Sequence, residues 1–513
     1  MRRKILKSLN KTFNSEPQFS EQSNANDIEL KKQDISRHYA QNIETFKSIF
    51  SIPKNIDVKV REFTIRSLNL RAFIIYIGTM VDTDQVQRSI VKPLIENEQP
   101  SRKIQDIVSF PVGKTIINIG EITENITRGI TALFVDGDHQ CYVFETTKIE
   151  GRGIEKSDNE VIVKGAKEAF NEKLADNIAL IRKKIKNENL IVEAHVITKR
   201  SRNDVLIVYE KDLVNDELLQ KIKNRLASID TDSILDLSIL EQYLEERPRS
   251  LFPTLLNTER PDRAASFLEE GHIVLLMSNS PNCIVLPATF WALFHSPEDH
   301  YLRTPYGNFI RFLRFLALFI SLFASSFYIA ITNYHVGMIP PDLLMAMAGT
   351  RERVPFPSII EILMMEIAFE LIREAGLRVP SPIGPTIGIV GALILGQAAV
   401  QANIISPIVI IVIALSGLSS FIISDTSMNF AIRISRFLII FAAGFLGIYG
   451  VAALSIVGLF YLVSLKSFGT PYFAPMTPHF FSGKDLLIRH VPMKASFRPG
   501  YLKTKDMVKQ RKD

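Results

Sequence analysis

The stretch FLALFISLFASSFYIAIT, residues 315–332, contains 18 residues and no charge. As a helix it is about 27 Å long, which is enough to cross the hydrocarbon core of a thin membrane. Arg303, Arg311 and Arg314 precede it with no acidic residue among them, so its N-terminal end is expected on the cytoplasmic side. The sequence therefore predicts an α-helical multi-pass transmembrane domain over residues 309–465, with four to six membrane segments. Further uncharged apolar stretches cover residues 383–400, 404–423 and 437–463.

Charge divides the 513-residue chain into unlike parts. The net charge of +6 is the sum of −2 over residues 1–308, +1 over 309–465 and +7 over 466–513. The short basic tail at 466–513 is typical of a cytoplasmic segment beside a membrane. If the tail and the charged N-terminal region are both cytoplasmic, the number of spans is even. Arg433 and Arg436 then fall on the opposite side, in conflict with the same rule.

Several classes of protein are excluded by composition. Two cysteines do not support a disulfide scaffold or a multi-cysteine metal centre. The basic excess is local, which argues against a nucleic-acid-binding face. The nine histidines are scattered without metal-ligand spacing, so no metal, no cofactor and no enzymatic activity are expected.

The first 300 residues alternate short apolar runs with helical periodicity and so predict an α/β fold. Two segments repeat with an offset of 142 residues: GITALFV followed by QCYVF from Gly129, and GHIVLLM followed by NCIVL from Gly271. The offset also relates Cys141 to Cys283. We interpret this as two related α/β subdomains, although generic strand–helix units can look alike by coincidence. The expected segments are a disordered polar and basic tail at 1–44, subdomains at 45–150 and 190–308, and a connecting amphipathic helix at 151–189.

Residues 358–377 (SIIEILMMEIAFELIREAGL) form an unusual apolar helix because they carry four carboxylates. Glu366, Glu370 and Glu374 share one face with Arg373 beside them, and Glu361 lies on the opposite side. Each carboxylate facing lipid would cost about 2.5–3.5 kcal/mol near the membrane centre. The stripe must therefore face water, a partner helix or a pore. It is either a ring of carboxylates that favours cations in an oligomer, or the solvated face of an interfacial helix partly paired to Arg373.

The next apolar segment, residues 383–400, is rich in small residues. These permit close helix approach, and the amides that follow would be unsatisfied in lipid. The segment is either a tightly packed helix or one that lines or gates a pore. The candidate residues are Gly384, Gly388, Gly391, Gly396, Gln397 and Gln401.

These residues together resemble the GerA family of endospore-forming bacteria, and in particular the A subunit of a spore nutrient germinant receptor. The resemblance covers about residues 45–480. One position departs from the family pattern, because Gly165-Ala166 stands where Gly-Pro is common. The motifs that carry the resemblance are TERPD at 258–262, PFPSIIEILMMEIAFELIREAGLR at 355–378, IGPTIGIVG at 383–391, GQAAV at 396–400, SP at 406–407, SFGTPY at 467–472 and NIALIR at 177–182.

The resemblance implies a multi-pass protein of the spore inner membrane, in contact with membrane lipid, whose N-terminal domain faces the spore core. It implies a transporter-like B subunit and a lipoprotein C subunit as partners. It further implies a homo-oligomer that forms a gated cation channel and triggers germination. The alternative is a non-conducting scaffold or transducing subunit of the same receptor, or of a related late-sporulation channel complex.

Overall fold

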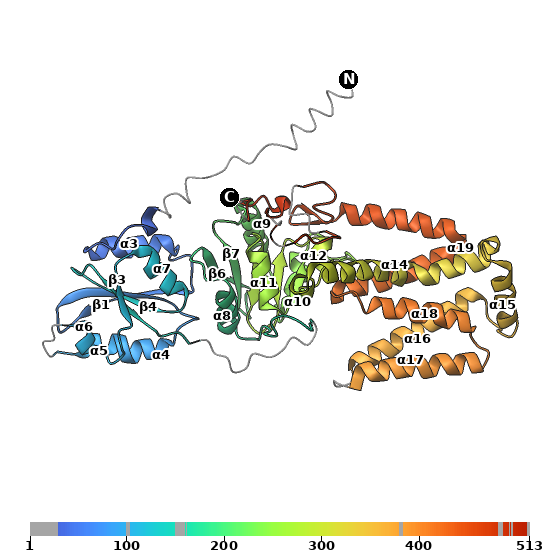
Figure 1. Ribbon diagram of the computed structural model, residues 1–513, viewed down its shortest axis with the longest axis horizontal. Helices are drawn as coiled ribbons and strands as arrows, with labels where there is room; N and C mark the ends of the chain where they lie inside the picture. Colours follow the sequence, from blue (N-terminus) through green and yellow to red (C-terminus); the bar gives the residue numbers. More distant parts are fainter. Residues whose placement is uncertain are drawn as a thin grey trace, which may run out of the picture.

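The computed structural model describes residues 29–98, 103–148, 160, 162–378, 383–480, 486–491, 493 and 496–509. Three bodies lie in a row along the molecule: a first sheet with its helices, a second sheet with its helices, and a bundle of long helices (Figure 1). The two sheets make up the α/β N-terminal region that the sequence predicts, and the bundle begins where the long uncharged stretch begins.

The first subdomain is a five-stranded antiparallel sheet with helices on both faces. Alternate residues of one strand point to opposite faces, so Phe73 and Ile75 pack with α3 and α7, while Ile74 packs with the helices of the other face. The strand order is β1-β2-β4-β5-β3. The elements are α3 (Tyr39–Ile49), β1 (Val58–Ile65), β2 (Leu70–Ile77), α4 (Thr83–Gln85), a π-helix (Val86–Val91), α5 (Lys92–Glu96), α6 (Ile104–Ile107), β3 (Lys114–Ile116), α7 (Ile119–Thr127), β4 (Thr131–Val135) and β5 (Cys141–Phe144).

The second subdomain repeats this topology, with strand order β6-β7-β9-β10-β8. Helices α8 and α11 cover one face, and α9 and α10 cover the other. The elements are α8 (Leu174–Lys184), β6 (Leu190–Ile197), β7 (Asn203–Glu210), α9 (Asp216–Ala227), α10 (Leu237–Leu244), β8 (Leu256–Thr258), α11 (Pro261–Leu268), β9 (Ile273–Met277), β10 (Cys283–Leu286), α12 (Phe290–Phe294) and α13 (Glu298–Tyr301).

The predicted duplication agrees with this topology in detail. The elements β3, α7, β4 and β5 begin 142 residues before β8, α11, β9 and β10. Gly129 and Gly271 both adopt a positive φ, of 87° and 92°, before their strands. Cys141 and Cys283 are both buried and free. An asparagine clamp also recurs, because Asn42 bonds the backbone of Ser36 and Asn177 bonds the backbone of Asn171 in the same way.

Two predicted boundaries differ from the structure. The first subdomain begins before residue 45, because α3 starts at Tyr39 and buries Ile43 and Phe46 in the core. The helix placed between the subdomains is α8, which is the counterpart of α3 and packs into the second core rather than linking two domains. Both helices are amphipathic, and each buries its apolar face in the core of the sheet that follows it in the chain. Residues 1–28 of the predicted tail lie outside the described residues.

The bundle contains one helix that turns back on itself. Helix α19 (Thr426–Ser464) is interrupted at Gly447, whose φ of 61° and ψ of −140° are not helical. A straight helix of 39 residues would be about 58 Å long. Yet Met428 near its start packs into the core of the second subdomain, and Tyr461 near its end bonds Ser250 of the same subdomain. Helix α19 is therefore a hairpin of two antiparallel helices, as Figure 1 shows.

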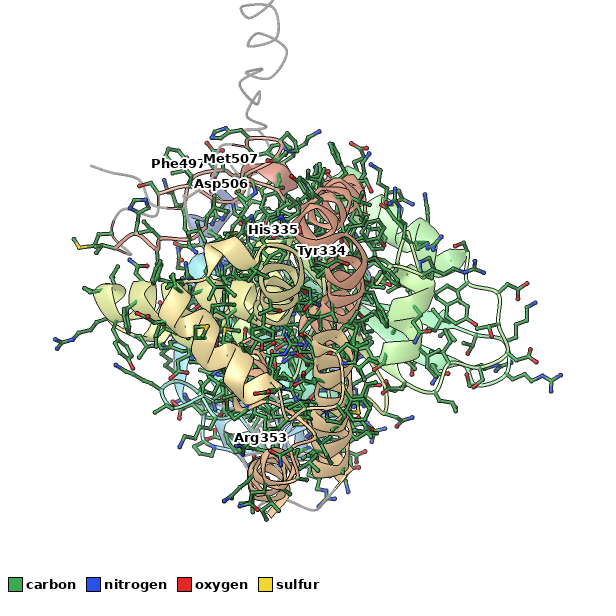
Figure 2. All side chains as sticks on the ribbon, turned by 90° about the vertical axis from the view of Figure 1, so that its right-hand side faces the viewer. Tyr334, His335, Arg353, Phe497, Asp506 and Met507 are labelled. Atoms are coloured by element: carbon green, nitrogen blue, oxygen red, sulfur yellow. The ribbon has the colours of Figure 1, made fainter. Side chains whose placement is uncertain are left out.

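Helices α14, α16, α17 and α18 run along the length of the bundle, and α15 lies at the end far from the second subdomain (Figure 1). Tyr334 and His335, at the end of α14, lie beside the α19 hairpin, and the Tyr334 hydroxyl donates to Gly444 O (Figure 2). Two helices of the described residues, α14 and α19, are long and apolar enough to cross a membrane. The elements are α14 (Thr304–Tyr334), a 3-10 turn (Val336–Met338), α15 (Pro341–Arg351), α16 (Ser358–Arg378), α17 (Ile383–Gln401) and α18 (Pro407–Ser420).

The C-terminal tail returns to the second subdomain. It contains the short hairpin β11 (Lys466–Ser467) and β12 (Thr470–Pro471), and a 3-10 turn (Gly500–Leu502). Tyr472 is fully buried, and its carbonyl accepts from Phe290 N. Lys505 N donates to Leu213 O. The tail and the soluble domain therefore lie at the same end of the bundle.

Candidate functional site in the helical bundle

Glu366 and Glu370 of the carboxylate stripe of α16 face the interior of their own bundle. Glu366 is fully buried, and its Oε1 accepts from Ser325 Oγ of α14 at 2.7 Å. Its Oε2 lies 3.0 Å from the Arg436 guanidinium of α19, which is 1% exposed. A carboxylate in this position is stable only because a cation and a hydroxyl accompany it.

One turn later, Glu370 contacts two arginines of α19. Its Oε1 lies 3.0 Å from Arg433 Nε and 2.9 Å from Arg436 NH2. Arg436 also donates to Ser416 Oγ of α18 at 3.0 Å. These contacts join α16, α18 and the first half of α19 through a single buried guanidinium.

Arg373 does not form the ion pair predicted for it. Its guanidinium donates to Gly417 O at 3.2 Å and to Ser420 Oγ, and it lies 4.1 Å from the centre of the Phe421 ring. Arg433 and Arg436 form the ion pairs of the stripe instead. Because Arg433 and Arg436 are paired inside the bundle, the rule that predicts sidedness from free cytoplasmic charges does not apply to them.

The two outer carboxylates of α16 lie in different surroundings. Glu361 is fully buried, and its Oε2 accepts from Ser406 N at 2.9 Å, directly before α18. It therefore satisfies a free N–H group at the start of that helix, with Arg351 Nε 3.9 Å away. Glu374, at the other end of α16, is exposed.

Helix α17 lies at the edge of the bundle, packed chiefly on α16 (Figure 1). A Cβ at Gly391 would meet Ile372, and one at Gly396 would meet Ile410, both at ordinary contact distance. Gln397 and Gln401 are one turn apart and exposed on the outer surface. Gly384 and Gly388 belong to α17, but their surroundings lie outside the described residues.

A second charged cluster fixes the base of α14. Asp299 of α13 accepts from Arg314 NH1 at 2.7 Å and from Arg311 Nε at 3.2 Å, and all three side chains are buried. Burial raises the pKa of the Asp299 carboxyl, but the hydrogen bond and charge of Arg314 outweigh it and hold the pKa below its usual value. Arg311 and Arg314, predicted as orienting charges, thus attach the first bundle helix to the second subdomain.

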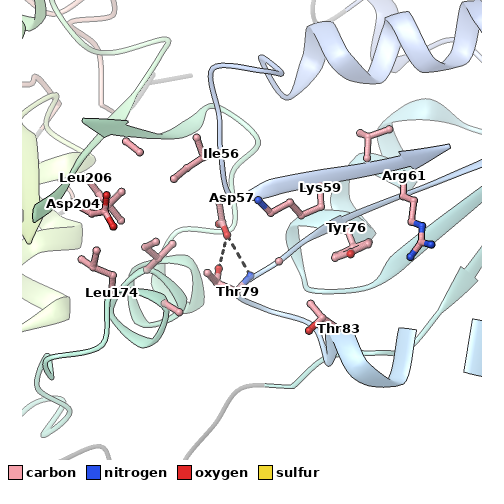
Figure 3. Close-up of a pocket in the computed structure, with 15 residues that line it drawn as sticks. Ile56, Asp57, Lys59, Arg61, Tyr76, Thr79, Thr83, Leu174, Asp204 and Leu206 are labelled. Atoms are coloured by element: carbon pink, nitrogen blue, oxygen red, sulfur yellow. Dashed lines mark hydrogen bonds between the residues drawn. The ribbon is translucent and has the colours of Figure 1, made fainter. Parts of the chain in front are cut away.

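A cleft with a volume of about 730 Å³ lies between the two subdomains (Figure 3). Asp57 lies at its edge and accepts from Thr79 Oγ1 at 2.8 Å and from Arg182 Nε at 3.0 Å. Lys59, Arg61 and Tyr76 line it on the side of the first subdomain. In the described part of the chain, no three histidine, cysteine or acidic side chains are grouped to hold a metal ion.

Sequence reasoning missed Arg433 and Arg436 as members of the site. They lie more than 60 residues from Glu366 and Glu370, beyond the reach of any local pattern. One signal in the sequence could have identified them: Arg433 and Arg436 are basic residues close to an apolar segment, and acidic and basic residues within apolar segments tend to pair with one another.

Comparison with known proteins identifies the family of this chain. The family model described as "Bacillus/Clostridium GerA spore germination protein" matches residues 44–501. Spore germination protein KA of Bacillus subtilis is 38% identical over 93% of this chain and 89% of its own length. Spore germination protein B1 of the same organism is 33% identical over 93% of this chain and all of its own length.

Two further relatives extend the comparison. Spore germination protein GerLA of Bacillus cereus is 34% identical over 90% of this chain and 97% of its own length. The crystal structure of the N-terminal domain of the A subunit of the Bacillus megaterium spore germinant receptor GerK3 is 28% identical, with a TM-score of 0.39, and covers 50% of this chain and 98% of that domain. The family model and the full-length relatives together show that the chain belongs to the GerA family of spore germination proteins.

Proposed function

We propose that this chain is the A subunit of a spore nutrient germinant receptor, and that several copies enclose a gated path for monovalent cations across the spore inner membrane. Its partners in this proposal are a transporter-like B subunit and a lipoprotein C subunit. Membership of the GerA family supports the receptor role. The exposed amide side chains on the outer face of α17 are the main support for the proposed cation path.

Six helical segments cross the membrane in this proposal: α14, α16, α17, α18 and the two halves of α19. Support comes from the outside of the bundle, where large apolar side chains such as Phe319, Ile411 and Phe445 are exposed. An even number of crossings puts the soluble domain and the tail on one side, which is the spore core.

Gln397 and Gln401 are the observation that favours a conducting oligomer. They are exposed on a helix that also exposes Ile394 and Leu395, at the edge of the single-chain bundle. Amides facing lipid lack hydrogen-bond partners, so this face requires water or a second copy of the chain. Neighbouring α17 helices around a common axis provide both.

Reconstitution of the full-length protein in liposomes tests the path by K⁺ flux. The double substitution Gln397→Leu and Gln401→Leu removes the polar lining, and we expect flux to fall about tenfold or more. Tyr449→Leu removes a polar group from an exposed position on α19 and is the matched control, with flux unchanged. Equal flux in wild type and the double variant contradicts α17 as the lining.

One observation favours the alternative of a non-conducting scaffold. Glu366 and Glu370 are neutralised by Arg433 and Arg436, so they brace helices and leave no charge for a cation. Under this alternative wild-type protein forms oligomers and binds its partner subunits but conducts no K⁺. In both cases Glu366→Gln is expected to lower the thermal stability of the protein, because it leaves the Arg436 guanidinium partly uncompensated. If the protein conducts K⁺, the flux through this variant should change little.

A further inference from the structure

One surface of the second subdomain lies directly at the end of the last bundle helix. Arg247 NH1, in the loop after α10, donates to Ser464 Oγ at 2.9 Å. Tyr461 donates from its hydroxyl to Ser250 Oγ at 2.9 Å. These bonds fix the loop 246–250 beside the last turn of α19. We call this loop, the face of α9 that carries Glu217, Lys221 and Arg225, and the hairpin β11–β12 the junction surface.

The junction surface contains a small basic pocket. Lys221 and Arg225 line a pocket of about 260 Å³ together with Glu246 and with Phe468 and Gly469 of the hairpin. The Arg225 guanidinium is held in place by bonds to Tyr243 O at 3.1 Å and Glu245 O at 3.0 Å. Gly469 has a φ of 82°, so the tight turn that closes the pocket requires glycine.

The balance of charge on the junction surface is basic. Arg247, Arg249 and Lys466 are exposed around the pocket, which makes five cations with Lys221 and Arg225. Two carboxylates accompany them, and both already accept hydrogen bonds. They are Glu217, which accepts from Lys221 at 2.7 Å, and Glu246, which accepts from Gly469 N at 2.7 Å.

The end of α19 shows at what depth this surface lies. Leu459, Phe460 and Val463 are exposed on the outside of the bundle. Lys466 follows within three residues, and an apolar helix end with aromatic residues and a cation marks the boundary between hydrocarbon and headgroups. Seen along the bundle, the green elements of the second subdomain project beyond the helices (Figure 2). The bundle therefore does not cover them from the membrane side.

We propose that the junction surface binds the headgroup phosphate of an anionic phospholipid in the leaflet on the side of the soluble domain. Lys221 and Arg225 bind the phosphate in the pocket, while Arg247, Arg249 and Lys466 attract neighbouring headgroups. The inference rests on the membrane insertion proposed above. Its consequence is that the soluble domain is attached to the membrane surface as well as to the bundle.

The test measures lipid selectivity of the full-length protein in bilayers of phosphatidylcholine that contain spin-labelled phosphatidylglycerol or spin-labelled phosphatidylcholine. The electron paramagnetic resonance spectrum reports the fraction of labelled lipid immobilised by the protein. We expect phosphatidylglycerol to be enriched about threefold or more over phosphatidylcholine, and the enrichment to fall at about 1 M salt.

A triple variant, Lys221→Gln, Arg249→Glu and Lys466→Glu, is expected to lose this enrichment. The matched control is Arg66→Glu, Arg88→Glu and Lys92→Gln, which makes the same charge change on exposed residues of the first subdomain and should keep the enrichment. Inorganic phosphate added to the solution should not displace the enriched lipid; if it does, the pocket binds a free anion and the lipid proposal is wrong.

The outcomes separate the two proposals. Absence of any immobilised lipid, including phosphatidylcholine, overturns the membrane insertion on which the proposed function depends. Immobilised lipid without preference for phosphatidylglycerol, or preference that the triple variant retains, overturns only the lipid site.

Discussion

The two soluble subdomains share one topology but differ in what they attach to. The first subdomain lies at the left of Figure 1 and contacts the second subdomain. The second contacts the first subdomain, the bundle and the returning tail. Equivalent positions of the two subdomains therefore carry side chains of different polarity where a further segment of the chain covers the second subdomain.

Three equivalent pairs illustrate this. Lys47 is partly exposed on α3, whereas its counterpart Arg182 on α8 is buried on Asp57. Ile77 ends β2, whereas Glu210 ends β7 beneath the tail residue Arg498. Ile130 follows the first positive-φ glycine, whereas His272 follows the second and contacts Tyr501 of the tail. The second copy thus carries buried polar groups where other segments cover it.

The largest effect is expected from Arg182→Met. Arg182 and Asp57 are each 1% exposed and join the two subdomains at 3.0 Å. The substitution leaves the Asp57 carboxylate buried without its cation, which costs about 3–5 kcal/mol. Trp291, the single tryptophan, lies in the core of the second subdomain, so its fluorescence during urea unfolding measures the loss. An unchanged midpoint would show that the interface does not depend on this pair.

The paired glycines give the next effect. Gly271→Ala forces a Cβ to within 2.4 Å of Thr504 in the tail at a φ of 92°, while Gly129→Ala meets its nearest atom at 3.1 Å. We expect losses of about 3 kcal/mol and about 1–2 kcal/mol, because both are strained but only the first displaces another segment. Hydrogen exchange of the β9 amides measures the loss of stability in Gly271→Ala, and that of the β4 amides measures it in Gly129→Ala. Equal losses would show that the contact with the tail does not contribute to the cost of Gly271→Ala.

The pH dependence of the second subdomain comes third. Burial, with Asp212 and Glu269 nearby, raises the pKa of Glu210 from 4.5 to about 8. The folded state therefore keeps a proton that the unfolded chain loses, and this stability is lost as pH rises through 8. Burial lowers the pKa of His272 from 6.5 to about 3, so its contribution is lost only as pH falls below 6.5.

Between pH 6.5 and 8 stability should fall by about 2 kcal/mol, chiefly through Glu210. Burial and the neighbouring Glu245 also raise the pKa of Glu241, to about 7, so this carboxyl adds a smaller loss at the lower end of the same range. Glu210→Gln should flatten this slope in urea titrations followed by Trp291 fluorescence. The first subdomain, with Ile77 at the equivalent position, should not share the slope in hydrogen exchange of β2.

The smallest effect is expected from Lys47→Met, the counterpart of Arg182→Met. Lys47 and Glu62 lie 3.7 Å apart and are 34% and 53% exposed. Such surface pairs contribute about 0–1 kcal/mol. Hydrogen exchange of α3 amides should barely change, and a loss comparable with that of Arg182→Met would remove the distinction between the two copies.

Much of this architecture can be predicted from sequence because it depends on local patterns. The two α/β subdomains follow from apolar strands at a fixed offset, and Gly129 and Gly271 mark positions where only glycine adopts the conformation at no cost. The charged face of α16 follows from the spacing of its glutamates. Its partners do not, because Arg433 and Arg436 reach it only through tertiary packing.

Two other features were beyond sequence reasoning. A single glycine in an apolar stretch is common in membrane helices, so Gly447 does not reveal that α19 turns back. The charge of the basic tail predicts a cytoplasmic segment beside the membrane, but charge does not reveal that Tyr472 and Leu502 are buried and anchor the tail on the second subdomain. In both cases one or two residues determine the direction of a much longer segment of the chain.

The return of the tail sets an order for biosynthesis. Arg498 bonds Glu269 O, and Lys505 bonds Leu213 O, so the second subdomain is completed by residues made more than 200 positions after it. At about 5–20 residues per second, the ribosome needs on the order of 10–50 s to supply them. The whole bundle is synthesised in that interval. A chain that stops before Arg498 therefore lacks the residues that lie against Glu210 and His272 in the folded subdomain.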